Sequence, residues 1–196
     1  MKKLVLITLV SFMIISCKND QEKTPNDEPL QKEESTEKVE TTKKKVLSPH
    51  TSAMAMVGDA HVHIDYSSPG VRNRTIFGGL VAYDSIWQAG AHMVTWMQTN
   101  KDLKIDGNDL PAGKYALFMI PSQDEWTIIF NKHWEQHGKD EYDEKDDVIR
   151  FEVTPEISEE ITEHLVYEVS ETGTTEGMIS FSWEKVTMSF RFEVIE

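Results

Sequence analysis

The alternation of apolar and polar residues is clearest near the C-terminal end of the chain. Residues 185–195 alternate apolar side chains, from Val186 to Val194, with polar ones. A period of two puts successive side chains on opposite faces of a β-strand, so this pattern predicts a strand with one buried face. The same alternation, over shorter stretches, predicts strands at residues 60–66, 92–99, 103–106, 125–132, 147–154, 165–169 and 179–183.

Other segments complete the predicted fold. Residues 113–120 are apolar on both faces, which is typical of a central strand. Asp106-Gly107 is a hairpin-turn signal. Apolar residues four apart within residues 157–165, after Pro155, predict at most a turn or two of helix. Short strands between turns, with no long amphipathic helix, predict an all-β domain, either a single antiparallel β-sandwich or an open barrel.

The N-terminal residues have the pattern of a lipoprotein signal peptide. Two lysines precede an apolar run at residues 4–15, which is too short to span a bilayer but suits a signal-peptide core. Ser16 and Cys17 follow, as the small residue and the cysteine of a lipobox. Cys17 is the only cysteine in the chain and cannot form an internal disulfide. We therefore expect residues 1–16 to be cleaved and Cys17 to carry the lipid that anchors the chain to a membrane.

Residues 17–46 lack hydrophobic periodicity and are rich in Lys, Glu, Asp and Thr. Such a segment cannot bury enough apolar surface to offset its chain entropy, so we expect a disordered linker. Residues 47–196 then form one β-sandwich domain of ordinary size, which we expect to be a monomer. The predicted location is the cell envelope, on the outer membrane facing the periplasm. Acidic residues within residues 18–22 leave the cell surface open as an alternative.

The negative charge of the chain lies on the predicted domain. The whole chain has a formal net charge of −14, and residues 47–196 alone carry −15, from 11 basic and 26 acidic residues. A domain this acidic repels nucleic acid and anionic lipid, so both are excluded as partners of the domain. The charge does not exclude a small ligand, a glycan or an envelope protein as the partner of the domain.

The candidate metal ligands are histidines. In one predicted strand, His61, His63 and Asp65 are two residues apart and project from one face, with a spacing of roughly 6.5 Å. Neutral imidazoles are common donors to zinc and similar divalent transition metals. The site would use His61, His63 and His92 as ligands. His137 would be an auxiliary ligand, and Asp65 would orient His63. The alternative is that these histidines only form the polar, solvated face of a strand.

Other residues are candidates for binding a small ligand. Arg72 and Arg74 could hold a carboxylate or a phosphate between their guanidinium groups. The alternative is that they pair with acidic side chains of the domain itself. Arg74 and Asp65 are the predicted ligand-binding residues. Tryptophans such as Trp134 could provide stacking platforms for sugars.

Five short motifs follow one another through the domain: VHIDYSSP at residues 62–69, RTIFGGLV at 74–81, WQAGAH at 87–92, LPAGKYALFMIP at 110–121 and WTIIFN at 126–131. This ordered set resembles the bacterial family called domain of unknown function 2911, over residues 47–195. The family has no assigned activity, so the resemblance implies a domain boundary and not a reaction. Many members have Trp-Arg-Thr-Gly-Ala-Asn where this chain has WQAGAH. Gln88 and His92 replace the arginine and the asparagine, so a role for that arginine does not carry over.

Two functional hypotheses follow. The first is an envelope lipoprotein whose domain binds a small ligand, glycan or protein partner without catalysis, which requires only a sandwich with a groove. The second is a metal-dependent hydrolase that uses His61, His63 and His92, with no individual catalytic residue assigned. The sequence has no serine-centred nucleophile elbow or phosphate-binding glycine loop that would favour another reaction. Convergence of the three histidines at one point would discriminate between the two hypotheses.

Overall fold

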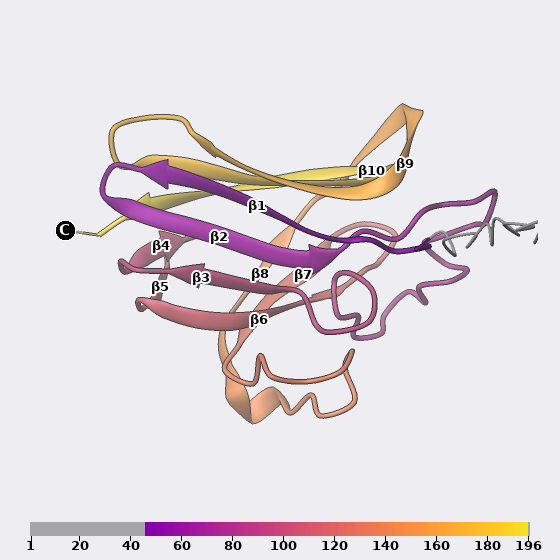
Figure 1. The fold of residues 1–196 in the computed structure, drawn as a ribbon, viewed down its shortest axis with the longest axis horizontal. Coiled ribbons are helices and arrows are strands. Elements are labelled where there is room, and N and C mark those ends of the chain that lie inside the picture. The colour runs from indigo at the N-terminus through magenta and orange to yellow at the C-terminus, as the bar shows by residue number, and fades with distance from the viewer. Residues whose placement is uncertain (1–45, 196) are drawn as a thin grey trace, which may run out of the picture. The chain divides into compact units, whose positions relative to one another are not determined.

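The computed structural model describes residues 46–195, which form two antiparallel β-sheets packed face to face (Figure 1). The predicted β-sandwich is thereby confirmed. The predicted signal peptide, Cys17 and the linker up to residue 45 lie outside the described residues. The six-stranded sheet has the order β1-β2-β3-β6-β7-β8, and the four-stranded sheet has the order β5-β4-β10-β9.

The strands of the six-stranded sheet are β1 (His50–Val57), β2 (Ala60–Ser67), β3 (Trp96–Thr99), β6 (Gly113–Ile120), β7 (Trp126–Asn131) and β8 (Asp147–Val153). Those of the four-stranded sheet are β4 (Leu103–Ile105), β5 (Asn108–Leu110), β9 (Glu156–Glu171) and β10 (Glu176–Val194). The described residues contain one short 3-10 helix, η1 (Glu144–Asp146). No helix within residues 46–195 is long and apolar enough to cross a membrane.

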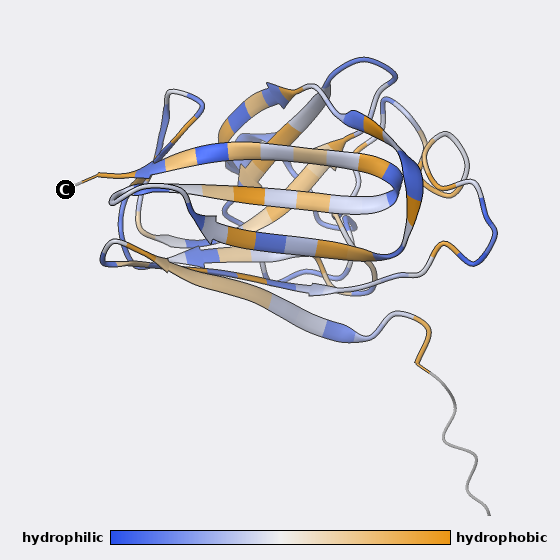
Figure 2. Cartoon of the chain, turned by 90° about the horizontal axis from the view of Figure 1, so that it is seen from above, coloured by the Kyte–Doolittle hydropathy of each residue, from blue (hydrophilic) through white to orange (hydrophobic). Residues whose placement is uncertain are grey.

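The hydrophobic core lies between the two sheets. Val62 and Ile64 of β2 are fully buried within it. Along β10, Phe190 is buried and its neighbour Arg191 is exposed, as the alternation predicts. Figure 2 shows this alternation as bands of hydrophobic and hydrophilic colour along the strands. Removing one face of each sheet from water is the main favourable term in folding such a sandwich.

Residues 157–165 form a strand and not the predicted helical turn. They belong to β9, which pairs with β10 through much of its length. Ile157 and Ile161 are 72% and 58% exposed. A spacing of four places residues on one face of a strand as well as of a helix, so the pattern does not distinguish the two. Pairing with β10 supplies hydrogen bonds to the backbone of this segment and therefore decides the structure.

Several strand boundaries also differ from those predicted. The strands predicted at residues 179–183 and 185–195 form one continuous strand, β10. The strand predicted at residues 92–99 begins only at Trp96. β1 is not among the predicted strands. Its sequence is HTSAMAMV, and these mostly small and polar residues alternate only weakly between apolar and polar.

The connection between β2 and β3 runs through residues 68–95 and covers one end of the sandwich (Figure 1). Gly70 forms an isolated bridge with His164 of β9. Trp87 forms a second bridge with Met119 of β6. Since β9 and β6 belong to different sheets, the connection is attached to both layers of the sandwich.

Candidate ligand-binding cleft

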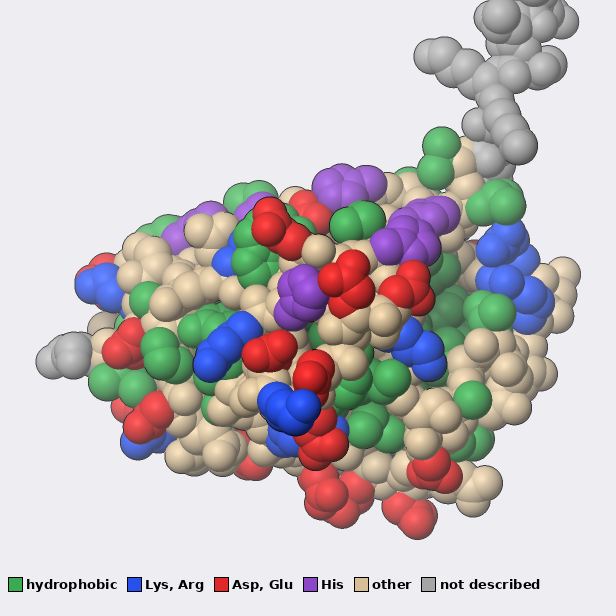
Figure 3. Space-filling model, turned by 90° about the horizontal axis from the view of Figure 1, so that it is seen from below, with side chains coloured by type: hydrophobic (Ala, Val, Ile, Leu, Met, Phe, Trp, Pro, Cys, Tyr) green, Lys and Arg blue, Asp and Glu red, His purple; other side chains and the backbone are tan. Residues whose placement is uncertain are grey.

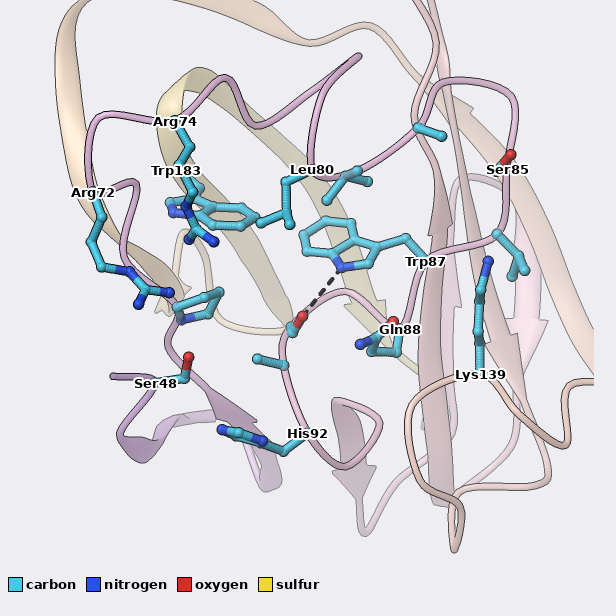
Figure 4. A pocket seen from close by; sticks show the side chains of 16 residues that line it. Ser48, Arg72, Arg74, Leu80, Ser85, Trp87, Gln88, His92, Lys139 and Trp183 are labelled. Carbon is cyan, nitrogen blue, oxygen red and sulfur yellow. Dashed lines mark hydrogen bonds between the residues drawn. The ribbon is translucent and has the colours of Figure 1, made fainter. Parts of the chain in front are cut away.

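A cleft of about 460 Å³ lies beside the 68–95 connection. The basic side chains in its lining are Arg72, Arg74, His92 and Lys139, and the described lining residues include no Asp or Glu. Figure 4 shows Arg72 and Arg74 on one side of the cleft and Lys139 across from them. In a domain whose formal net charge is −15, this lining is a local concentration of positive charge.

The guanidinium group of Arg74 is held by the backbone that precedes it. Its Nε donates to the carbonyl oxygen of Val71 at 3.0 Å, and its Nη2 donates to that of Gly70 at 2.6 Å. Arg72 is exposed, and both Arg72 and Asn73 have left-handed backbone conformations, with φ of 50° and 56°. The turn therefore presents to the same cleft one arginine that is held by the backbone and one that is exposed.

Neither guanidinium group forms an ion pair within the described part of the chain, and nor does Lys139. Glu163 accepts a hydrogen bond from the backbone N–H of Arg72 at 3.0 Å, and not from its side chain. By contrast, Arg150 pairs with acidic side chains at 2.9 and 3.1 Å. The basic groups of the cleft are thus not neutralised by ion pairs among residues 46–195.

Two tryptophans join the cleft to the core. Trp87 and Trp183 both line the cleft, although each is almost fully buried. Nε1 of Trp87 donates to the carbonyl oxygen of Gly90 at 3.2 Å, as Figure 4 shows. Leu80 and Ile86 add further apolar surface to the lining. The cleft therefore combines basic groups on its sides with an apolar wall.

The backbone around the cleft is strained. Ala89 has φ of 52° and is fully buried, in a left-handed conformation that is costly for a residue with a Cβ. Its carbonyl oxygen accepts hydrogen bonds from Tyr167 Oη at 2.8 Å and from Thr95 Oγ1 at 2.9 Å. A Cβ at Gly90 would lie 2.5 Å from Thr95 Oγ1, so a larger residue would force the Thr95 side chain away from its hydrogen bond to Ala89. Strained backbone persists only where its surroundings hold it, and it is concentrated at functional sites. The left-handed non-glycine residues of this region are Arg72, Asn73, Asp84, Ala89 and His92.

The structure separates the predicted metal ligands. His61 and His63 lie side by side on the outer face of β2, with ring centroids 6.1 Å apart. His92 belongs to the lining of the cleft. Residues 46–195 contain no group of three or more His, Cys, Asp or Glu side chains that could hold a metal ion. The predicted trio is not gathered, because β2 ends at Ser67 and His92 lies in the connection that follows.

Asp65 and His137 have contacts other than those expected. Oδ1 of Asp65 is 2.9 Å from Nε2 of His50 on β1, so the imidazole that it orients is that of His50 and not of His63. Nδ1 of His137 is 3.4 Å from Oδ2 of Asp140. Of the two predicted ligand-binding residues, Arg74 lines the cleft and Asp65 does not.

Asp65 instead lines a second hollow, of about 360 Å³, on the outer face of the six-stranded sheet. There, Nζ of Lys114 lies 3.5 Å from the ring centroids of both Trp96 and Trp134. Burial lowers the pKa of Lys114, and the charges of Asp65 and Glu135 act in the opposite direction. The indole faces that meet this ammonium group are not free to stack on a sugar.

The lining residues that were not predicted to belong to a site include Gln88, Lys139 and Trp183. Gln88 lies in the WQAGAH motif, and this motif is the one sequence feature that could have pointed to a residue of the cleft. Trp183 follows the core alternation of its strand, and Lys139 stands among acidic residues. Neither pattern indicates a cleft.

The model of the family described as "Protein of unknown function (DUF2911)" matches residues 48–192, a span that includes the whole lining of the cleft. No curated protein and no solved structure matches the chain. Because the match covers most of the sequence, the chain belongs to the DUF2911 family.

Proposed function

We propose that this domain binds a small organic anion in the cleft, through a carboxylate or phosphate group of the ligand. The observation that carries the proposal is the presence of Arg72 and Arg74 in a cleft whose described lining has no Asp or Glu. A guanidinium group presents several N–H donors in one plane, which suits paired hydrogen bonds to carboxylate or phosphate oxygens. Of the three predicted kinds of partner, which were a small ligand, a glycan and an envelope protein, the proposal selects a small ligand that carries a negative charge.

Arg74 supports the proposal because its position is set before a ligand arrives. Two of its N–H donors are used by backbone carbonyls, and the guanidinium group has further donors that are available. A side chain that is already fixed loses little entropy on binding, so more of the interaction energy contributes to affinity. Arg72, which is exposed, would close on the ligand from the mouth of the cleft.

The apolar wall indicates what the rest of the ligand is like. Leu80 is 54% exposed and lines the cleft, as do the half-buried Ile86 and the indole of Trp87. An apolar or aromatic body placed against these side chains would remove their surface from water. Clefts of this kind typically combine an apolar lining with a few polar groups that set the orientation of the ligand. We therefore expect an amphipathic anion and not an inorganic one.

The test is a calorimetric titration of the full-length protein with aromatic carboxylates and phosphate monoesters. Each anion is paired with an uncharged amide or alcohol of the same shape. We expect only the anions to bind, with an affinity that falls as salt is added. Arg74→Gln should weaken binding at least about tenfold, because a hydrogen bond to a charged group contributes about 1.5–3 kcal/mol.

Arg191→Gln is the matched control, because it removes an exposed arginine of β10 that is not part of the cleft. It should leave the affinity unchanged. An equal loss in Arg191→Gln and Arg74→Gln would mean that only the overall charge of the domain matters. Equal binding of the uncharged compounds would contradict the proposal directly.

A further inference from the structure

Two methionines of β1 are exposed to water. Met54 and Met56 are 55% and 53% exposed, whereas Met97, Met119 and Met188 are buried. Methionine is an apolar side chain that usually fills gaps in a core. Packing therefore does not require a thioether at either exposed position.

Each of these methionines lies opposite a histidine. In the antiparallel pairing of β1 with β2, Met54 is the partner of His63 and Met56 is the partner of His61. Directly opposite residues project from the same face, with Cβ atoms about 4.5–5.5 Å apart. The two imidazole rings are themselves 6.1 Å apart. Two flexible thioethers and two imidazoles thus project from the same face of two paired strands. Figure 3 shows histidine side chains close to hydrophobic ones along one edge of the face seen from below.

His63 has unused hydrogen-bonding capacity. Its Nε2 is buried and has no hydrogen-bond partner within residues 46–195. Its ring packs edge-on against Trp96, with centroids 5.1 Å apart, which restricts its orientation. A buried polar atom without a protein partner is uncommon, and such atoms are typically satisfied by a bound water or ion or serve a functional role.

We propose that Met54, Met56, His61 and His63, which we call the thioether–imidazole cluster, bind a soft monovalent metal ion, Cu(I). Thioether sulfur and unprotonated imidazole nitrogen are uncharged donors, and thioether sulfur favours Cu(I) over harder divalent ions. The nearest acidic side chain along β2, Asp65, is already paired with His50. Structural zinc sites, by comparison, are usually built from cysteine thiolates and histidines. The cluster lies outside the lining of the cleft, so this proposal does not depend on anion binding.

The test is a competition between the full-length protein and a chromophoric Cu(I) chelator without oxygen, with Cys17→Ser in every variant so that no thiol competes. Ag(I) serves as a redox-inert second probe. We expect one equivalent of either ion per chain. Met54→Leu/Met56→Leu keeps the apolar volume and should weaken Cu(I) binding at least about tenfold, a loss seen even for residues that only support a metal ligand. His61→Asn/His63→Asn should abolish binding.

Met93→Leu is the matched control, because Met93 is 53% exposed but lies outside the cluster. It should leave Cu(I) affinity unchanged, and so should Arg74→Gln, which tests the cleft alone. Since Met54 and Met56 are exposed, their replacement by leucine should not alter the melting temperature of the metal-free protein. Unchanged Cu(I) affinity in Met54→Leu/Met56→Leu, an equal loss in Met93→Leu, or tighter binding of zinc than of Cu(I) would overturn the proposal.

Discussion

Trp183 stacks on Trp87, with ring centroids 5.8 Å apart and ring planes inclined by 21°. Trp183 belongs to β10 and Trp87 to the connection between β2 and β3, so the stack joins the core to the cleft. The two indole N–H groups differ. That of Trp87 donates to Gly90, whereas that of Trp183 is buried without a partner in the described part of the chain. Because protein cores are closely packed, the two indoles hold this part of the cleft wall in place.

This difference predicts unequal costs for the same substitution. Trp87→Phe and Trp183→Phe each remove a similar volume from the core, but only Trp87→Phe breaks a hydrogen bond and leaves a carbonyl oxygen unpaired. Trp87→Phe should therefore lower the free energy of unfolding by about 1–3 kcal/mol more than Trp183→Phe does. Denaturant unfolding of the two variants measures this difference. Equal costs would show that the Trp183 N–H is in fact satisfied.

The register of β10 predicts opposite responses at neighbouring positions. Phe190 is buried against Phe151 and Phe130, with ring centroids 5.1 and 6.4 Å away. Phe190→Ala should lower the free energy of unfolding by about 3–5 kcal/mol, since it leaves a cavity. Arg191→Ala, on the exposed face, should change it by no more than about 0.5 kcal/mol. A larger loss of stability in Arg191→Ala than in Phe190→Ala would show that the assigned register of β10 is wrong.

Tyr142 predicts a loss of stability at alkaline pH. Burial, followed by the hydrogen bond to Asp147, raises the pKa of Tyr142 from 10.0 to about 12. Between these values the unfolded chain loses the proton before the native chain does, so stability falls as pH rises through this window. Burial also raises the pKa values of Tyr66, Tyr115 and Tyr167, so other tyrosines add to the fall.

Tyr142→Phe should make that fall shallower without removing it. The measurement is the free energy of unfolding from pH 9 to pH 12, with tyrosinate absorbance recorded in parallel. The variant should lack one of the late-titrating tyrosines. An identical pH profile in both proteins would show that Tyr142 titrates alike in the native and unfolded chains.

The lipobox pattern predicts that Cys17 becomes the N-terminal residue and carries lipid. The intact mass of membrane-extracted protein should then show the added acyl chains. Cys17→Ala should move the protein out of the membrane fraction, because the acyl chains are the expected anchor. A variant that remains in the membrane fraction to the same extent would contradict lipidation as the means of attachment.

Local sequence patterns were sufficient to predict the features that depend on neighbouring residues. The alternation along β10 identified its buried face, because side chains two apart in a strand share one environment. Asp106-Gly107 identified the turn between β4 and β5, where φ is 47° and 77°. A two-residue hairpin turn needs left-handed conformations at both positions, and this dipeptide tolerates them. Such preferences depend only on nearby residues, so they can be predicted from the sequence.

The conformation of β9 and the make-up of the sites depend on contacts between residues that are distant in the sequence. The spacing in residues 157–165 suits a helix or a strand equally, and pairing with β10 selected the strand. The cleft brings together Arg74, Lys139 and Trp183, which are distant along the chain. His92 was expected beside His61, but it lies in the lining of the cleft. Which distant side chains meet depends on how the two sheets pack and where the long connection is attached, and no local pattern of residues carries that information.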